Sequence, residues 1–398
     1  MQLGLIAEEK LPPDNRVALT PAHCKWLVKN IPNLTIVVEA SSTRCFTNEE
    51  YTRAGIPIVT RLINCNYILG IKEVPYHKLL PNVTYLFFSH TIKKQAYNKK
   101  LLQTVLQQKI TLVDYECLKH ADGQRILGFG FFAGVVGAHN GIMAYGIRTG
   151  AYSLPRVYQQ KDLQSLMHNY FGLKIPAIKI AITGSGRVAH GVLEVMNLMG
   201  IIEVEPEDYL STAYNYPVYT QIKGADLYQQ TATGTYSRKH FHANPSQYHC
   251  LFANYLQSTH ILMNGVYWDE NTPRLFTKEQ IQHPSCTLVT IADITDDEGG
   301  SVPINLGDQT IENPTYGVCK TTFAKTQPYL PNSIDVMAVG NLPNELPRDA
   351  SRYFGEQLIK HILQPLFDGN SEIITQATIA TNGTLTAPYH YLQQWVSS

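Results

Sequence analysis

The segment KIAITGSGRVAHGVLEV, residues 179–195, constrains the fold of this chain more than any other stretch. A short apolar and β-branched run leads directly into glycines, and a helical pattern follows, so the segment predicts a strand, a tight turn and a helix. Gly184 permits a turn that a residue with a Cβ disfavours, Gly186 lets the backbone approach a phosphate, and the helix start offers unpaired N–H groups. The pattern predicts a dinucleotide-binding turn, whose expected residues are Gly184, Ser185, Gly186, Arg187 and Val188.

An acidic residue at a suitable spacing supports this interpretation. A second apolar run, residues 201–204, ends at Glu205, which lies 21 residues after Gly184. In dinucleotide-binding folds an acidic side chain near this spacing binds the ribose hydroxyls, and because it repels a 2′-phosphate it favours NAD(H) over NADP(H). The third glycine of the usual motif falls one place late, at Gly191. The alternative is an ordinary glycine-rich connection between a strand and a helix.

Before Arg148, β-like runs alternate with helical ones, which is typical of parallel sheets covered by helices. We expect an α/β fold of two Rossmann-like domains whose parallel sheets are separated by a cleft. The apolar segment 129–147 contains a histidine, an asparagine and five glycines, so it predicts a buried connecting helix and not a membrane span. Residues 208–255 lose their periodicity and stay unassigned. The expected domains are residues 1–135 with 311–398 for substrate and catalysis, and residues 136–310 for the dinucleotide.

The composition excludes some partners. The 32 basic and 32 acidic residues cancel, so charge gives no reason to expect nucleic acid or an anionic membrane surface as a partner. Seven scattered cysteines without a C-x-x-C pair indicate reduced thiols, and the first residues do not resemble a signal peptide. A cytoplasmic protein is expected.

Polar side chains follow the apolar runs of the first domain. Because ligands bind beyond the carboxyl ends of parallel strands, these side chains are candidates for a site. Lys72 and His90 follow neighbouring runs and form a candidate acid and base pair, although a solvated lysine and a satisfied core histidine are the alternatives. Arg16 offers a fork for a carboxylate, or else forms a surface salt bridge. The other candidates are Asp14, Glu73 and Glu116, with Lys93 and Arg125 as their possible ion-pair partners.

Two further patterns each have a functional and a structural interpretation. Asp297 precedes a Gly-Gly turn at the end of a strand in the dinucleotide domain, where it either faces the nicotinamide or caps the turn. His240, His242 and His249 invite a metal hypothesis, but no nearby cysteine or carboxylate completes a four-ligand set, so no metal is expected.

Several stretches resemble the saccharopine dehydrogenase family. They are RVALTP, GIKEVP, SHTIKKQ, VDYE, GFGFFAGVVGA, NGVYWDENTPRLF, IADITDDEGG and NLPNELPRDAS. The sequence is similar to the lysine–2-oxoglutarate reductase half of aminoadipate-semialdehyde synthase, and a broader likeness extends to alanine dehydrogenase and the transhydrogenase nucleotide subunit. The resemblance implies a nicotinamide-dependent enzyme that interconverts saccharopine with lysine and 2-oxoglutarate through an imine, as a monomer or a small homo-oligomer.

The resemblance also implies roles for single residues. Lys72 and His90 match a pair that exchanges protons while a carbinolamine forms and loses water. Arg16 matches an arginine that grips a substrate carboxylate, and Asp14 lies where related enzymes have a glutamate that tunes the lysine. The residues that match the lining of the substrate pocket or the cofactor face are Glu73, Lys93, Glu116, Arg125 and Asp297.

The sequence departs from the family where Gly340 replaces an acidic residue before the NLP motif. The cofactor stays open between NAD(H) and NADP(H), because the reductase half carries a similar acidic residue at the position of Glu205 and is associated with NADP. Two alternatives remain. One is an enzyme of the alanine dehydrogenase type that uses ammonium and a small 2-oxo acid, and the other is a non-catalytic nicotinamide sensor.

Overall fold

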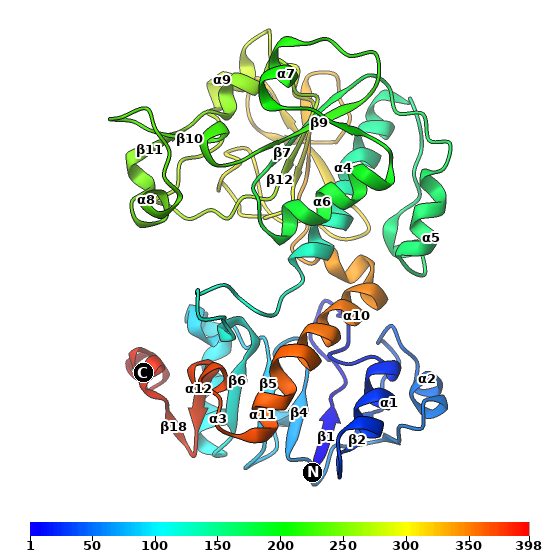
Figure 1. Cartoon of the computed structure of the whole chain (residues 1–398), viewed down its shortest axis with the longest axis vertical. Coiled ribbons are helices and arrows are strands. Elements are labelled where there is room, and N and C mark those ends of the chain that lie inside the picture. The colour runs from blue at the N-terminus through cyan, green and yellow to red at the C-terminus, as the bar shows by residue number, and fades with distance from the viewer. Residues whose placement is uncertain (398) are drawn as a thin grey trace. The chain divides into compact units, whose positions relative to one another are not determined.

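Two eight-stranded sheets organise the chain in the computed structural model, which describes residues 1–397 (Figure 1). The sheets belong to two compact units, described here separately. Unit 1 comprises residues 1–129 and 347–398, and unit 2 comprises residues 130–346. The expected α/β class with mostly parallel sheets is confirmed.

The sheet of unit 1 has the order β18-β17-β6-β5-β4-β1-β2-β3. The six strands from β6 to β3 run parallel, and β17 and β18 close one edge as antiparallel strands. The strands are β1 (Gln2–Leu5), β2 (Thr35–Glu39), β3 (Ile58–Val59), β4 (Tyr67–Leu69), β5 (Thr84–Phe87), β6 (Thr111–Asp114), β17 (Thr378–Thr381) and β18 (Thr384–Leu385).

Helices bury both faces of this sheet. Side chains alternate between faces along a strand, so Leu69 joins the core beneath α1, α10 and α11, whereas Ile68 joins the core beneath α3 and α13. The helix α1 begins where Thr20 and His23 form a capping box and Pro21 occupies the first turn. The helices are α1 (Pro21–Asn30), α2 (Asn48–Arg53), α3 (Lys99–Gln107), α10 (Pro347–Leu358), α11 (Gln364–Asp368), α12 (Glu372–Ala377) and α13 (Gln393–Ser397), and a π-helical turn (Ile359–Leu363) joins α10 to α11.

The sheet of unit 2 has the order β15-β14-β16-β13-β12-β7-β9-β8. The strands from β16 to β8 run parallel, and β14 and β15 form an antiparallel edge. They are β7 (Lys179–Thr183), β8 (Ile202–Glu203), β9 (Val218–Ile222), β12 (Ile261–Asn264), β13 (Thr290–Asp293), β14 (Thr315–Cys319), β15 (Lys325–Thr326) and β16 (Ser333–Met337), with β10 (Tyr228–Gln230) and β11 (Tyr248–Cys250) pairing separately.

Helices also cover the sheet of unit 2. The predicted connecting helix is α4, which is largely buried and packs on α6 and on β12, β13 and β16. No helix within residues 1–397 is long and apolar enough to cross a membrane. The other face carries α7, α9 and an aromatic core. The helices are α4 (Gly130–Thr149), α5 (Leu163–Met167), α6 (Arg187–Leu198), α7 (Pro206–Ser211), α8 (Arg238–Ala243) and α9 (Lys278–Gln282).

The structure differs from the expected organisation in two places. Residues 311–346, expected in the first domain, belong to unit 2, because β14 and β16 continue the sheet from β13. The boundaries lie at 129/130 and 346/347, not at 135/136 and 310/311. The unassigned segment 208–255 contains β9, which enters the main sheet, and it continues through β10, α8 and β11.

Candidate functional site

The predicted strand-end residues of unit 1 follow four adjacent parallel strands. The order β6-β5-β4-β1 places the carboxyl ends of these strands along one edge. Asp14 and Arg16 follow β1, Lys72 and Glu73 follow β4, and His90 follows β5. Glu116 follows β6. All these residues therefore follow the carboxyl ends of strands at the same edge of the sheet, as the rule that ligands bind beyond these strand ends predicts.

A chain of charged hydrogen bonds connects three of these strand ends. The Glu73 carboxylate contacts His90 Nδ1 at 2.6 Å and accepts from Lys10 Nζ at 2.6 Å. Burial alone raises the pKa of Glu73, but the bonds from His90 and Lys10 outweigh it and hold the pKa at about 2. His90 adopts the left-handed backbone conformation, with φ of 52°, which is uncommon for a residue with a side chain. An ionised Glu73 therefore orients the imidazole through Nδ1.

The amine of Lys72 lies among charges and has no direct partner among the described residues. Lys72 is half-buried, and its Nζ makes no ion pair or hydrogen bond within residues 1–397. Burial and the neighbouring guanidinium of Arg16 lower its pKa, while Asp14 opposes this change. A lowered pKa raises the fraction of neutral amine near neutral pH, as a general base or nucleophile requires.

Arg16 and Asp14 form a buried pair and not a surface salt bridge. Arg16 Nε and Nη2 donate to the Asp14 carboxylate at 2.9 Å and 2.5 Å, and the guanidinium lies 4.1 Å from the ring centroid of Phe129. Their side chains are 3% and 1% exposed. Burial alone raises the pKa of Asp14, but Arg16 outweighs it and holds the pKa at about 2.

This pair predicts a contribution to stability that acid removes. Because its pKa falls from the usual 3.8 to about 2, Asp14 stabilises unit 1 fully above about pH 4, and the contribution is lost as the pH falls through 2. The expected change in the free energy of unfolding is about 2 kcal/mol. Hydrogen exchange of the amides of β1 and β4 between pH 5 and pH 2 measures it. Asp14→Asn should reduce the change in the free energy of unfolding with pH. The control Glu356→Gln, an exposed change in α10, should not alter it. The same pH profile in the wild type and in Asp14→Asn would contradict this prediction.

Glu116 contacts the two basic residues that the sequence offered as partners. Its Oε1 accepts from Arg125 Nη2 at 2.8 Å and lies 3.6 Å from Lys93 Nζ. Its Oε2 is buried and has no hydrogen-bond partner within residues 1–397. One carboxylate oxygen is thus left to accept from a ligand.

Glu8 is a site residue that the sequence analysis missed. Its Oε1 accepts from the backbone N–H of Ile71 at 2.6 Å, and its Oε2 accepts from that of Lys72 at 3.0 Å. Burial and the neighbouring Asp14 raise the pKa of Glu8 to about 8, against the backbone bonds and Arg16, which lower it. Glu8 and Lys10 follow β1, so the strand-end rule that selected the other residues could have found both.

Because Glu8 holds the backbone that carries Lys72, its removal should loosen this strand end. In Glu8→Ala the amides of Ile71 and Lys72 should exchange about tenfold faster. Turnover should fall, by up to about 10²-fold, since a small displacement of a catalytic group is costly. Glu9→Ala is the matched control, because Glu9 pairs with Lys78 on the surface. Unchanged exchange at both amides in Glu8→Ala would refute the role.

In unit 2 the glycine-rich turn has the shape that the motif predicts. Gly184 has φ of +98°, and a Cβ there would lie 2.9 Å from the carbonyl oxygen of Gly265. A Cβ at Gly186 would meet no atom within 4 Å, and Gly186 caps the start of α6. The turn thus presents open backbone at a helix N-terminus, as a pyrophosphate requires. Ser185 is exposed beside it, and Arg187 and Val188 begin α6.

The late third glycine has a structural role. A Cβ at Gly191 would lie 1.9 Å from the carbonyl oxygen of Phe131, and one at Gly134 would lie 2.0 Å from that of Val188. The two glycines therefore let the backbones of α4 and α6 touch.

Glu205 lies farther from the glycine-rich turn than its spacing in the sequence predicts. The run at 201–204 contains β8, and β9 lies between β8 and β7. The reason is that the unassigned segment supplies a strand that pairs with β7 over its whole length. Glu205 is exposed, at the start of α7, one strand farther from the turn than expected.

Asp297 is exposed after β13, and the adjacent Asp296 lies in a denser group of carboxylates. Burial, then the carboxylates of Asp308 and Asp293, raise the pKa of Asp296 to about 8. A Cβ at Gly340 would lie 3.1 Å from an oxygen of both Asp296 and Asp308. An acidic side chain at this position would add a further negative charge beside these two carboxylates, whereas glycine adds none.

The histidines considered for a metal do not form a ligand group. Within residues 1–397 no cluster of three or more histidine, cysteine or carboxylate side chains could hold a metal ion. His240 Nδ1 contacts the hydroxyl of Tyr248 at 3.1 Å, and His249 Nδ1 contacts Thr231 at 3.4 Å.

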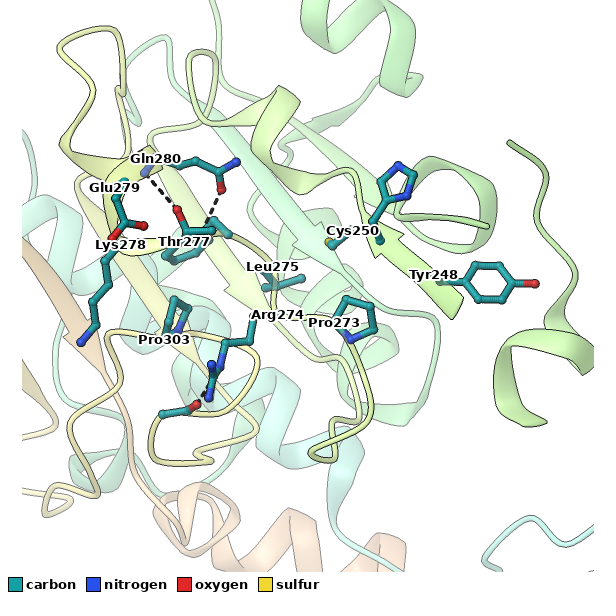
Figure 2. Close-up of a pocket in the computed structure, with 13 residues that line it drawn as sticks. Tyr248, Cys250, Pro273, Arg274, Leu275, Thr277, Lys278, Glu279, Gln280 and Pro303 are labelled. Atoms are coloured by element: carbon teal, nitrogen blue, oxygen red, sulfur yellow. Dashed lines mark hydrogen bonds between the residues drawn. The ribbon is translucent and has the colours of Figure 1, made fainter. Parts of the chain in front are cut away.

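Unit 2 has a cavity of about 740 Å³, whose lining includes His249 and Gly299. Figure 2 shows side chains of its lining, Arg274 among them. Arg274 Nε donates to the carbonyl oxygens of Gly299 and Gly300 at 3.1 Å and 3.2 Å. Thr277 and Gln280 form the capping box of α9 beside it. None of the predicted site residues lines this cavity, so cavity size does not identify the catalytic group.

Comparisons with known proteins agree with this fold. Residues 4–136 match the alanine dehydrogenase/PNT N-terminal domain. The chain is 31% identical to the mitochondrial alpha-aminoadipic semialdehyde synthase of Rattus norvegicus over 96% of its own length and 46% of that protein, so it spans about half of that relative. It is 26% identical to a protein of Emericella nidulans named saccharopine dehydrogenase (NAD(+), L-lysine-forming). This match covers 94% of this chain and 95% of that one. A solved L-alanine dehydrogenase shares the fold, with a TM-score of 0.68, 15% identity and coverage of 100% and 99%.

Proposed function

We propose that this chain is a nicotinamide-dependent oxidoreductase. It is a homologue of the lysine-forming saccharopine dehydrogenases, and its residues 4–136 match the alanine dehydrogenase/PNT N-terminal domain. It interconverts saccharopine with lysine and 2-oxoglutarate. The observation that carries the proposal is one edge of unit 1. There Lys72, whose amine has no partner in the described part of the chain, follows β4, and His90, oriented by Glu73, follows the adjacent β5.

The residues of unit 1 suit the proton transfers of C–N bond formation. Lys72, with its lowered pKa, accepts a proton from the amine of the substrate lysine, so that this amine attacks the keto carbon of 2-oxoglutarate. His90 donates a proton to the departing hydroxyl as the carbinolamine loses water to give the imine. Glu73 keeps the imidazole oriented in both steps.

Charged side chains around this pair suit a long substrate with carboxylates and an amine. Arg16 carries the charge that attracts a carboxylate of 2-oxoglutarate, and Asp14 holds its guanidinium in place. Glu116 Oε2, which has no hydrogen-bond partner within residues 1–397, accepts from an ammonium group of the substrate, beside Lys93 and Arg125.

The turn after β7 fits a dinucleotide, since Gly186 leaves open space beside the first turn of α6. Gly184, Ser185, Gly186, Arg187 and Val188 would hold its pyrophosphate, and Asp297 would lie toward its nicotinamide. The nicotinamide supplies or accepts the hydride when bound. All seven cysteines are free thiols, which supports a reducing compartment such as the cytoplasm, although the rat relative is named mitochondrial.

The test is the oxidation of NADH, and separately NADPH, by the purified chain. Lysine with 2-oxoglutarate should support turnover, whereas pyruvate with ammonium should not. Turnover only with pyruvate and ammonium would overturn the proposal in favour of the alanine dehydrogenase type. Dinucleotide binding without turnover on either pair would favour the sensor.

A further inference from the structure

The strand beside the glycine-rich turn decides which side chain meets the adenosine ribose. In dinucleotide-binding sheets the ribose lies over the end of the strand adjacent to the first strand, where an acidic residue binds its hydroxyls or a basic residue binds a 2′-phosphate. Here the adjacent strand is β9, which pairs with β7 from Lys179 against Val218 to Thr183 against Ile222. β8, with Glu203 and Glu205 near its end, pairs with β9 on the side away from β7.

The end of β9 contacts the turn directly. The backbone N–H of Gly184 donates to the carbonyl oxygen of Ile222 at 3.1 Å, and Gln221 Nε2 donates to the carbonyl oxygen of Gly184 at 2.9 Å. The residue that follows these two contacts is Lys223. Its position after the adjacent strand is the one that the acidic residue of an NAD-binding sheet occupies.

Lys223 carries a charge that no carboxylate of the described residues neutralises. Its Nζ donates to Gln221 Oε1 at 2.7 Å, the side chain is exposed, and it forms no ion pair within residues 1–397. Gln221 therefore connects the ammonium group to the first glycine of the turn. The next acidic residue along the chain, Asp226, is exposed three residues later.

We propose that Lys223 binds the 2′-phosphate of the dinucleotide and that the chain prefers NADP(H) to NAD(H). The proposal rests on the proposed function, in which the turn after β7 holds a dinucleotide. It reverses the preference for NAD that Glu205 indicated, because that residue lies beyond β9.

The experiment is a fluorescence titration of the full chain with NADPH and with NADH. The wild type should bind NADPH about 10–100-fold more tightly, as expected for a hydrogen bond between charged groups. Lys223→Met should lower the affinity for NADPH to that for NADH and leave the affinity for NADH unchanged. Lys223→Glu should reverse the preference, so that NADH binds more tightly than NADPH. Lys239→Met, an exposed change in α8, is the matched control and should alter neither constant.

Two further measurements separate the possible failures. The competitors 2′,5′-ADP and 5′-AMP lack the nicotinamide and differ in the 2′-phosphate, so their affinities measure the contribution of this phosphate by itself. Lys223→Met should lower the affinity for 2′,5′-ADP only. Asp226→Asn should leave the binding of NADH unchanged. Three results would overturn this inference and leave the proposed function standing. They are equal affinity of the wild type for both dinucleotides, an unaltered ratio of the two affinities in Lys223→Met, and a weaker affinity for NADH in Asp226→Asn. Absence of binding by either dinucleotide would overturn the proposed function and this inference with it.

Discussion

Lys72→Met should lower turnover by about 10²–10⁴-fold, the range that proton transfer by one positioned side chain contributes. Methionine keeps a long apolar side chain but cannot exchange a proton. The amine of Lys72 has no hydrogen bond or ion pair within residues 1–397, so its loss leaves no buried partner unsatisfied and should cost little stability. The measurement is kcat with lysine and 2-oxoglutarate, together with titration of the nicotinamide cofactor.

The matched control for this change is Lys78→Met in the same connection between β4 and β5. Lys78 pairs with Glu9 on the surface, where an ion pair contributes little. It should keep normal turnover, and both variants should bind the cofactor as the wild type does, because the turn lies in unit 2. Normal turnover in Lys72→Met would show that another group accepts the proton.

Gly191→Ala should destabilise unit 2 by about 3 kcal/mol, at the upper end of the usual cost of overpacking. Its Cβ would lie 1.9 Å from the carbonyl oxygen of Phe131, and this neighbour is backbone, which cannot rotate away. The helices α4 and α6 would have to separate and lose contacts along their lengths. Chemical denaturation monitored by hydrogen exchange of the amides of β7 and β12 measures the loss.

Gly186→Ala is the control from the same motif. A Cβ there meets no atom within 4 Å, and the residue has φ of −88°, which alanine adopts freely. Stability should therefore stay within about 0.5 kcal/mol of the wild type, while dinucleotide affinity falls because the methyl group occupies the approach of the pyrophosphate. Equal stability of the two variants would mean that α4 and α6 can shift without cost.

Much of the local structure could be predicted because it depends on neighbouring residues. The apolar run, the glycines and the helical pattern of residues 179–195 gave β7, its turn and α6. Among the strands that the sequence left unassigned, β3, β15 and β18 have two residues each, too few to show a periodicity, and β9 lies within the aperiodic segment 208–255. Their existence depends on pairing with distant strands, which no local pattern records.

The candidate site was predicted to the extent that it follows from strand ends. Parallel strands bring their carboxyl ends to one edge whatever their order, so Lys72, Glu73 and His90 could be selected from the sequence. The partners of each side chain could not, since a contact between Glu73 and Lys10 joins residues 63 positions apart. The same is true of the bonds from the backbone after β4 to Glu8.

The sequence by itself determined the α/β class, the glycine-rich turn and the residues at the strand ends, because periodicity and turn chemistry act over a few residues. Only the tertiary structure decided that β9 and not β8 lies beside β7, and so that Lys223 and not Glu205 follows the strand next to the glycine-rich turn. It also decided that Arg16 is buried against Asp14. The physical reason is that strand order and burial are set by pairing and packing between segments far apart in the chain, where the most favourable arrangement of the whole sheet prevails over local spacing.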